Sequence, residues 1–301
     1  MALLGIIGGT GLYDIDGLEG VERVELETPY GAPSDAYVVG NLGERRLAFL
    51  PRHGVGHRIL PSELNFRANI HGFKQLGADA IVSVSAVGSL REHIEPGDVV
   101  VPHQFIDRTR GRISTFFGEG VVAHVGFADP FCPVLCDLAF ACAGGAGAEA
   151  HEGGVYVCME GPQFSTRAES HLYRSWGGDV IGMTNLQEAK LAREAEICFV
   201  TLAMATDYDC WRSEDEAVEV EDVLRVLKHN AVLARDIVQQ IAMQIGDDRA
   251  CTCRKALEGA VITDPACIAP ERIRELDAIA GRVLRPGTQE TRDQQKGENQ
   301  S

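Results

Sequence analysis

The sequence predicts a single α/β domain: a largely parallel or mixed central β-sheet flanked by helices. Three observations indicate this fold. Short apolar, β-branched runs alternate with stretches in which apolar residues recur at helical spacing. The 301 residues are 45% hydrophobic and 24% charged, as is ordinary for a globular protein. No linker rich in Pro, Gly and Ser interrupts residues 1–284, so we expect one domain over that range.

Six apolar runs are expected to form the main strands of the sheet. Each is short and consists of the β-branched and other apolar residues that fill strands buried on both faces. The runs are residues 3–7, 80–84, 98–102, 155–158, 180–183 and 198–205.

Helices are expected between these strands and after the last one. The candidates between strands are residues 63–76, 166–176 and 186–195. Asn185, followed three residues later by Glu188, resembles an N-cap with its reciprocal carboxylate. Residues 224–245 predict one long amphipathic helix, whose apolar positions include Leu224, Leu227, Val232, Ile237, Ile241 and Ile245.

The end of the chain divides into a helical extension and a polar tail. Two further helices are expected around residues 253–261 and 270–280, so that the C-terminal helices occupy about residues 221–281 of the domain. Residues 285–301 carry almost no apolar side chains, which predicts a disordered tail.

Charge and composition exclude several classes of protein. Lysine and arginine number 28 against 44 acidic residues, a net charge of −16, which argues against nucleic-acid and anionic-membrane partners. No apolar run approaches the ~20 residues of a membrane-spanning helix, and the start lacks a basic signal region, so a cytoplasmic location is expected.

The nine cysteines are expected to be reduced thiols. Cys251 and Cys253 do not match a usual zinc spacing, and no second Cys/His pair lies nearby in the chain.

Four segments at strand ends could bind an anion. Gly8-Gly9-Thr10-Gly11 offers close backbone amides and a hydroxyl, although a tight turn or a dinucleotide-binding loop would also explain it. Arg52-His53-Gly54 could clamp phosphate or be a solvated turn. The small residues around Ser85 and Ala86 follow a strand, and Thr184 is either an anion contact or an ordinary N-cap.

Two other segments could recognise a planar base. Phe164 and Ser165 follow a Gly-Pro turn, so the ring could stack on a base and the hydroxyl could bond its edge; a structural turn is the alternative.

Asp207 and Asp209 follow a nearly all-apolar strand. Desolvation and mutual repulsion should raise one pKa, giving one carboxyl that donates and one that accepts. Adenine offers a matching edge, with N7 as acceptor and N6 as donor. The alternative is an Asp cluster that binds a cation or caps a turn.

Taken together, seven motifs in order resemble the purine nucleoside phosphorylase superfamily and, within it, the methylthioadenosine phosphorylase branch, from about residue 4 to residue 245. The motifs are Gly8-Gly9-Thr10-Gly11, Arg52-His53-Gly54, residues 65–70, residues 127–133, Met159-Glu160-Gly161-Pro162, Glu188-Ala189 and residues 206–211. The branch often has Thr where this chain has Ser85, a change that keeps the hydroxyl.

The resemblance implies roles for individual residues. It implies a phosphate site formed by Thr10, Arg52, His53, Ser85, Ala86 and Thr184. It implies base contacts from Phe164, Ser165, Asp207 and Asp209, with Met183 against the ribose and Val220 near the 5′ substituent. His124 looks like the residue that reaches a neighbouring subunit's 5′ pocket, which implies a homotrimer or homohexamer. The C-terminal helices and the Cys251–Cys253 pair look like those of longer members, in which a disulfide is possible.

The expected reaction is phosphorolysis of S-methyl-5′-thioadenosine, with phosphate as co-substrate and neither metal nor organic cofactor. Asp207 is the expected acid beside N7, and Asp209 is its partner. An apolar Val220 suits a methylthio group, because a 5′-hydroxyl there would lose its hydrogen-bond partner. The alternatives are a broader phosphorylase acting on adenosine, inosine or methylthioinosine, a nicotinamide-binding oxidoreductase that uses the Gly5–Gly11 glycines, and a non-catalytic nucleoside-binding protein.

Overall fold

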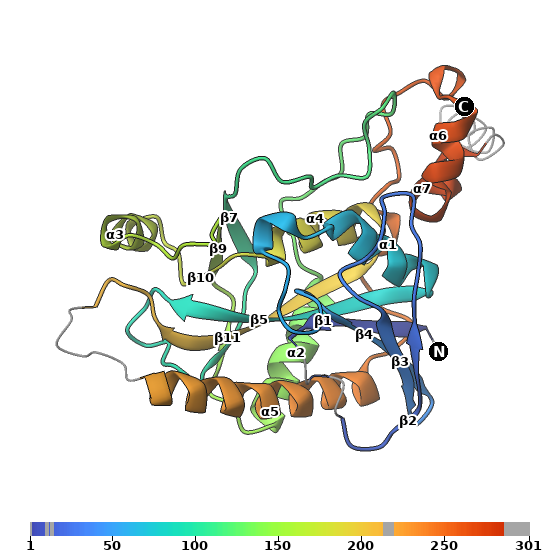
Figure 1. Cartoon of the computed structure of the whole chain (residues 1–301). Coiled ribbons are helices and arrows are strands. Elements are labelled where there is room, and N and C mark those ends of the chain that lie inside the picture. Colours follow the sequence, from blue (N-terminus) through green and yellow to red (C-terminus); the bar gives the residue numbers. More distant parts are fainter. Residues whose placement is uncertain (1, 10–11, 13–14, 213–219, 286–301) are drawn as a thin grey trace, which may run out of the picture.

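The computed structural model describes residues 2–9, 12, 15–212 and 220–285, and the side chains of residues 220–224 are not described. Its described part confirms the predicted fold class, with one mixed sheet between two layers of helices (Figure 1). The expected tail, residues 285–301, lies outside the described residues except for Arg285.

Within the described residues the sheet has eleven strands, in the order β2-β3-β4-β1-β5-β10-β9-β7, with β11 beside β5 and β6, and β8 beside β6. The strands are β1 (Leu3–Gly8), β2 (Leu18–Val24), β3 (Tyr37–Leu42), β4 (Arg45–Pro51), β5 (Ala78–Ser89), β6 (Val99–Val101), β7 (Gln104–Arg108), β8 (Ala150–Glu152), β9 (Val155–Met159), β10 (Val180–Gly182) and β11 (Cys198–Tyr208).

The sheet consists of two groups of parallel strands joined by antiparallel pairs. Strands β4, β1, β5 and β11 run parallel to one another, as do β10, β9 and β7. Antiparallel pairs join β2 to β3, β3 to β4, β5 to β10 and β6 to β11. Because parallel neighbours end at the same edge, the loops that follow β1, β4, β5 and β11 gather on one side of the domain.

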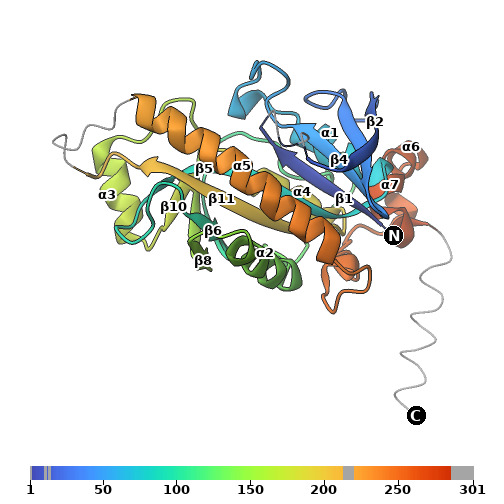
Figure 2. The same cartoon turned by 90° about the horizontal axis from the view of Figure 1, so that it is seen from below.

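Helices cover both faces of the sheet. On one face lie α1 (Phe66–Gln75) and α4 (Asn185–Glu194), and on the other lie α2 (Pro133–Gly145) and the long α5 (Val220–Gln244) (Figures 1 and 2). Helix α3 (Arg167–Ser175) lies beyond β9 and β10, and α6 (Pro270–Glu275) and α7 (Asp277–Leu284) lie near α1 (Figure 1). Burial on both faces explains why β5 and β11 are almost continuously apolar.

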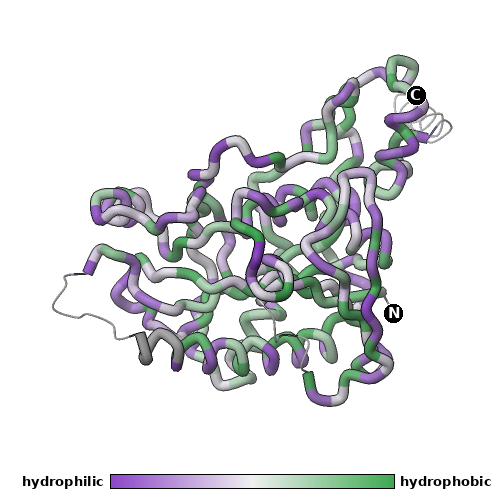
Figure 3. The backbone as a smooth tube through the Cα atoms, viewed as in Figure 1, coloured by the Kyte–Doolittle hydropathy of each residue, from purple (hydrophilic) through white to green (hydrophobic). Residues whose placement is uncertain are grey.

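The hydropathy of the chain follows these layers. The central strands are mostly hydrophobic, whereas α5 alternates hydrophobic and hydrophilic residues along its length (Figure 3). Ile237 and Ile241 on α5 are buried, and so is Ile245, which directly follows the helix. Leu227 and Val232 are 40% and 49% exposed, so the apolar side of this helix is not buried at these two positions.

Several local predictions are also wrong. Residues 253–261 form only a short 3₁₀ turn, Cys253–Lys255, and residues 270–280 divide into α6 and α7 at Leu276. Thr184, not Asn185, is the N-cap of α4, and Asn185 is buried as its first helical residue. The six-strand pattern omits β2, β3, β4, β7 and β8, and no helix is predicted where α2 forms.

Candidate active site

A cavity of about 770 Å³ opens at the carboxyl ends of the parallel strands, which is within the usual size range for small-molecule sites. Its walls come from the ends of β1, β4, β5, β9, β10 and β11 and from one face of α5. Among the residues that line it are Gly8, Gly9, Arg52, His53, Ser85, Ala86, Met159, Phe164, Met183, Thr184, Thr206, Asp207, Asp209, Leu227, Asn230 and Ala234. Leu227 is therefore partly exposed because it faces this cavity.

The floor of one end is a buried ion pair between Arg52 and Glu188, whose side chains are 4% and 1% exposed. Arg52 Nε donates to Glu188 Oε1 at 2.6 Å, and Nη2 donates to Glu188 Oε2 at 3.1 Å and to Ser83 Oγ at 2.7 Å. Arg52 Nη1 donates to the Val84 carbonyl at 2.9 Å. These bonds use four of the five guanidinium N–H groups, so one remains for a ligand in the cavity.

Asn185 completes this buried network instead of capping the helix. Its Nδ2 donates to Ser83 Oγ at 2.7 Å and to Thr201 Oγ1 at 3.2 Å. Ser83 Oγ in turn donates to Glu188 Oε2 at 2.7 Å. The Asn185/Glu188 pattern that resembles a capping box therefore reflects tertiary contacts, which fix the position of the Arg52 guanidinium.

His53 lines the cavity next to Arg52 and is held in one orientation. Its Nδ1 lies 2.8 Å from the Ile59 carbonyl, which can only accept, so Nδ1 carries the proton. Its ring stacks on His57 with 4.3 Å between centroids. Burial lowers the pKa of His53 to about 4, so the imidazole is neutral at pH 7. Its Nε2 is then an acceptor, which suits a protonated phosphate oxygen.

Hydroxyl groups and a helix N-terminus complete this end. Thr184 is the N-cap of α4, but its side chain makes no capping hydrogen bond, which leaves the hydroxyl available to a ligand. Ser85 is buried, with Oγ 3.4 Å from the Ala86 carbonyl. Because α4 begins here, its partial positive charge favours an anion. Arg52, His53, Ser85, Ala86 and Thr184 all line the same cavity, and Thr10 lies outside the described residues.

The opposite end carries the carboxyl pair. The register between β11 and β5 shifts at Thr206, where Ala205 pairs with Val87 and Asp207 pairs with Gly88. This bulge places Thr206 Oγ1 2.6 Å from Asp207 Oδ2, to which it donates. Burial, reinforced by the nearby Asp209 carboxylate, raises the pKa of Asp207 above its ordinary value.

Polar atoms without partners face this end. Asp209 is 8% exposed, and its Oδ2 has no hydrogen-bond partner among the described residues. Asn230 Nδ2 donates to the Ala205 carbonyl at 2.9 Å, but Asn230 Oδ1 is also without a partner there. Both residues line the cavity. Since unpartnered buried polar atoms are costly, a ligand that bonds to them would be favoured.

Gly88 provides room for the carboxyl pair. A Cβ atom on this residue would lie 3.3 Å from Asp207 Oδ1 and 3.4 Å from Asp209 Cβ. A side chain here would crowd both aspartates.

Between the two ends the wall is apolar. Met183 lies under Gly161, where a Cβ would come within 2.5 Å of the Met183 sulfur. Arg112 holds this region together by donating to the carbonyls of Met183 and Glu160. Phe164 is 83% exposed at the rim of the cavity. An exposed aromatic ring and a flexible thioether at one mouth suit a flat ring and a sugar.

The remaining predicted residues lie away from the cavity or are not described. Ser165 is not among the lining residues, and its Oγ donates to the Met159 sulfur at 3.7 Å. His124 is exposed and does not line the cavity of its own chain. Val220 is the first residue of α5, but its side chain is not described.

Glu188 and Asn230 are residues of the site to which the sequence pattern assigns no role. Glu188 belongs to one of the motifs shared with the resembled family, and this motif was the sequence feature that could have identified it as a site residue. Asn230 was a polar interruption of the α5 apolar stripe, and it lies with Leu227, Ala231 and Ala234 on one face of the helix. A polar residue within such a stripe is the signal that could have identified it.

The chain is similar along most of its length to known proteins. The S-methyl-5′-thioadenosine phosphorylase of Koribacter versatilis is 57% identical over 283 residues, 94% of this chain and 97% of that protein. The enzyme of the same name from Geobacter sulfurreducens is 55% identical over 280 residues, 93% of this chain and 98% of that protein.

A crystal structure of a methylthioadenosine phosphorylase from an antarctic soil metagenomic library superposes with a TM-score of 0.89. It is 47% identical, with 92% of this chain and 98% of that chain covered. Residues 3–242 match the sequence profile of the phosphorylase superfamily. The chain therefore belongs to the phosphorylase superfamily and, within it, to the methylthioadenosine phosphorylase branch.

Proposed function

We propose that this protein catalyses phosphorolysis of S-methyl-5′-thioadenosine, giving adenine and 5-methylthioribose 1-phosphate. One observation carries the proposal most directly. A single cavity joins the cluster of anion-binding groups at the start of α4 to the Asp207–Asp209 carboxyl pair, in a chain whose relatives bear this enzyme's name. A nucleoside lying between the two ends would place its sugar carbon C1′ next to phosphate and its base next to the carboxyls.

The base end supplies the proton that the departing purine needs. As the bond between C1′ and N9 breaks, its electron pair moves onto the purine ring. We assign Asp207, whose pKa is raised above its ordinary value by burial, as the acid that donates a proton to N7. Asp209 Oδ2, which has no protein partner among the described residues, accepts from the N6 amino group. A 6-oxopurine offers an acceptor at that position, so the pair favours a 6-aminopurine.

The phosphate end holds the nucleophile. Bound phosphate contacts the remaining Arg52 N–H, the Thr184 and Ser85 hydroxyls and the amides near Gly9 and Ala86. One phosphate oxygen attacks C1′ as the purine leaves, and phosphate charge offsets the positive charge that grows on the ribose. The buried partners of Arg52 keep this geometry fixed, so little reorganisation is needed during the reaction. Phosphate is the co-substrate, and this proposed mechanism uses no organic cofactor.

The apolar wall supports a methylthio group at the 5′ position. We assign Val220 to that pocket, as the resemblance implies, and place Met183 against the ribose. A 5′-hydroxyl in an apolar pocket would lose its hydrogen-bond partner, whereas a methylthio group would not. Preference for methylthioadenosine over adenosine follows from this difference.

We also propose that the protein acts in the cytoplasm as a homotrimer or homohexamer in which His124 completes a neighbour's 5′ pocket. His124 is exposed in the single chain. Beside it in the fold, Val122 and Ile262 are hydrogen-bonded neighbours that are 48% and 64% exposed. Exposed apolar side chains grouped in this way are typical of subunit contacts. None of the described helices is both long and apolar enough to cross a membrane.

The test is chromatography of methylthioadenosine, adenosine and inosine, each incubated with the enzyme in phosphate buffer and in phosphate-free buffer. We expect methylthioadenosine to release adenine only with phosphate, and faster than adenosine does, whereas inosine reacts least. Adenine release without phosphate would make the protein a hydrolase. Inosine as the fastest substrate would contradict the assigned base end. No turnover of any nucleoside, together with binding of adenine, would instead support a non-catalytic binding protein.

A further inference from the structure

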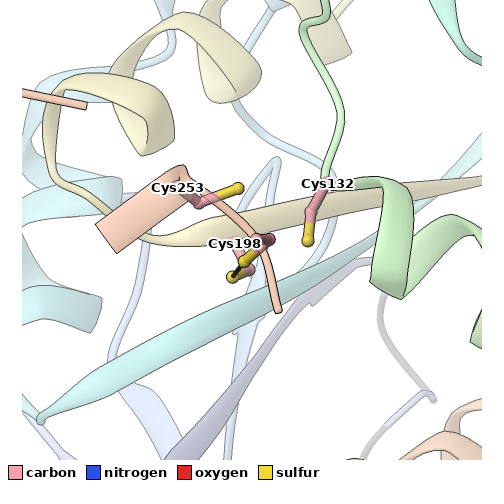
Figure 4. Close-up of side chains that lie close together, drawn as sticks. Cys132, Cys198 and Cys253 are labelled. Carbon is pink, nitrogen blue, oxygen red and sulfur yellow. Dashed lines mark hydrogen bonds between the residues drawn. The ribbon is translucent and has the colours of Figure 1, made fainter. Parts of the chain in front are cut away.

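Four cysteines that have no role in the proposed reaction meet at one point away from the cavity. The sulfur atoms of Cys132, Cys198, Cys251 and Cys253 all lie within 4.8 Å of one another, and those of Cys198 and Cys251 are 3.5 Å apart. Three of the residues are buried and Cys251 is partly buried. Figure 4 shows the side chains of Cys132, Cys198 and Cys253 converging from separate segments of the fold. None of the four lines the active-site cavity.

The fold brings these residues together from three distant parts of the chain. Cys132 is the N-cap of α2, Cys198 is the first residue of β11, and Cys251 and Cys253 follow α5. The Cys132 amide donates to the Phe199 carbonyl at 2.9 Å, which fixes the start of α2 against β11. The two-residue spacing of Cys251 and Cys253 is not a usual zinc pattern, but folding supplies the missing second pair.

Number, type and spacing of the donors fit one tetrahedral metal ion. A zinc ion bound by four thiolates has Zn–S bonds of about 2.3 Å, which corresponds to sulfur–sulfur separations of about 3.8 Å. The observed separations, from 3.5 Å between Cys198 and Cys251 to at most 4.8 Å within the cluster, include that value. All four donors are soft sulfur atoms, and among the described residues no carboxylate or imidazole belongs to the group. An all-thiolate tetrahedral set selects Zn²⁺ over hard cations such as Mg²⁺ and Ca²⁺.

The surroundings can support the negative charge of such a site. Four thiolates and one Zn²⁺ carry a net charge of −2, and the four protons leave to solvent when the metal binds. The Arg249 guanidinium lies close enough to Cys198 to interact with it electrostatically. Arg249 is 7% exposed, and its Nη2 pairs with Asp79 at 2.7 Å. Its buried Nε has no hydrogen-bond acceptor within the described part of the chain. A nearby cationic N–H group of this kind is typical of the groups that orient and tune metal-bound ligands.

We propose that Cys132, Cys198, Cys251 and Cys253 bind one structural Zn²⁺ that fastens the C-terminal segment to the sheet. This segment continues to Val261, which pairs with Ala123 in an isolated bridge, and the Ala260 carbonyl accepts from the His124 amide at 2.9 Å. The ion therefore stabilises the part of the chain that supports His124. It takes no part in bond cleavage.

The test is to measure zinc in the full-length protein, expressed with added zinc and purified under reducing conditions without chelators. We expect about one zinc per chain, bound through four thiolates. Exchange with Co²⁺ should give the charge-transfer and visible bands of a tetrahedral cobalt–thiolate centre. Cys253→Ser should lose the zinc and these bands. Cys267→Ser is the matched control, because Cys267 is an exposed thiol outside the cluster and its replacement should keep both.

A second measurement separates the metal site from its alternatives. A strong chelator should lower the unfolding temperature of the wild-type protein and of Cys267→Ser, whereas readdition of Zn²⁺ restores it. Reduced wild-type protein that binds neither Zn²⁺ nor Co²⁺ would overturn the proposal. Zinc retained in full by Cys253→Ser would overturn it as well. So would mass spectrometry of protein alkylated at lysis, if it found these four residues in disulfides.

Discussion

The two ends of the cavity differ in how their polar groups are satisfied. At the phosphate end, Arg52 and Glu188 are bonded to each other and to Ser83, and all three are buried. At the base end, Asp209 Oδ2 and Asn230 Oδ1 are buried without partners among the described residues. The first end is therefore held in shape by contacts within the protein. Asn185 Oδ1 in this network also has no partner among the described residues, but Asn185 does not line the cavity. The second end is left incomplete until a ligand supplies the missing hydrogen bonds.

This difference assigns different energetic roles to the two ends. A buried polar atom without a partner costs about 1–3 kcal/mol, which the folded protein bears and a matching ligand recovers. The unpartnered atoms at the base end therefore lower the stability of the free protein. They also favour binding of a purine whose edge forms the missing hydrogen bonds. The phosphate end contributes stability and fixed geometry. Substitutions at the two ends should accordingly separate stability from activity.

The largest effect on stability is expected from Glu188→Ala. Removing one partner of a buried ion pair leaves Arg52 charged and uncompensated, which costs about 3–5 kcal/mol. Urea unfolding should show this loss, and kcat/KM for phosphate should fall because Arg52 loses its orientation. The matched control is Glu271→Ala, which removes an ion pair with Arg274 whose side chains are 72% and 68% exposed. An exposed pair is worth about 0–1 kcal/mol, and equal losses in both variants would contradict the comparison.

At the base end, Asp207→Asn should affect activity and leave the fold intact. Loss of the general acid should lower kcat/KM for methylthioadenosine by about 10²–10⁴-fold. A buried acid with a raised pKa stabilises the fold at low pH and loses that contribution as pH rises through its folded pKa. Asp207→Asn should therefore gain stability relative to wild type as pH increases.

Activity assays and urea unfolding at several pH values check this prediction for Asp207→Asn. Asp248→Asn, an exposed carboxylate outside the cavity, is the control and should match wild type in both measurements. Unchanged kinetics in Asp207→Asn would remove its assigned role as the acid.

A smaller effect should appear in the pH dependence of the phosphate end. The pKa of His53 is lowered from 6.5 to about 4, so the unfolded chain takes up a proton before the native state does. Stability from His53 is complete above pH 6.5 and is lost as pH falls from 6.5 toward 4. We expect His53→Asn to show a shallower decline over this window. The His53 ring resonances should titrate near pH 4, and a midpoint near 6.5 would contradict the neutral-imidazole role.

The sequence could predict much of the fold because the central strands are buried on both faces. Strands β1, β5 and β11 are mostly apolar, and Arg52 and Asp207 lie at or next to strand ends, where α/β sheets bind ligands. Their convergence on one cavity follows from the parallel register. Local pattern and topology agree for these residues. Ser85 and Ala86 were expected to follow their strand, but β5 continues to Ser89 and both residues lie within it.

Other features depend on partners that no local pattern reveals. Helix α2 was not predicted because its sequence is apolar and small on nearly every face, so it lacks an amphipathic stripe. Glu188 resembles half of a capping box, but the buried Arg52 outcompetes the helix terminus for its carboxylate. Asn230 and the four clustered cysteines acquire their surroundings from segments more than twenty residues away.

The bulge at Thr206 makes the number of residues in β11 as important as their identity. Thr206 is the one residue of β11 that has no counterpart on β5, between the pairs Ala205–Val87 and Asp207–Gly88. Side chains alternate between the two faces of a strand, so removing one residue here would reverse the direction of every side chain that follows. Substitutions during evolution can change individual side chains around the purine pocket and leave the strand register intact. A one-residue insertion or deletion in this strand would instead turn Asp207 and Asp209 away from the pocket together.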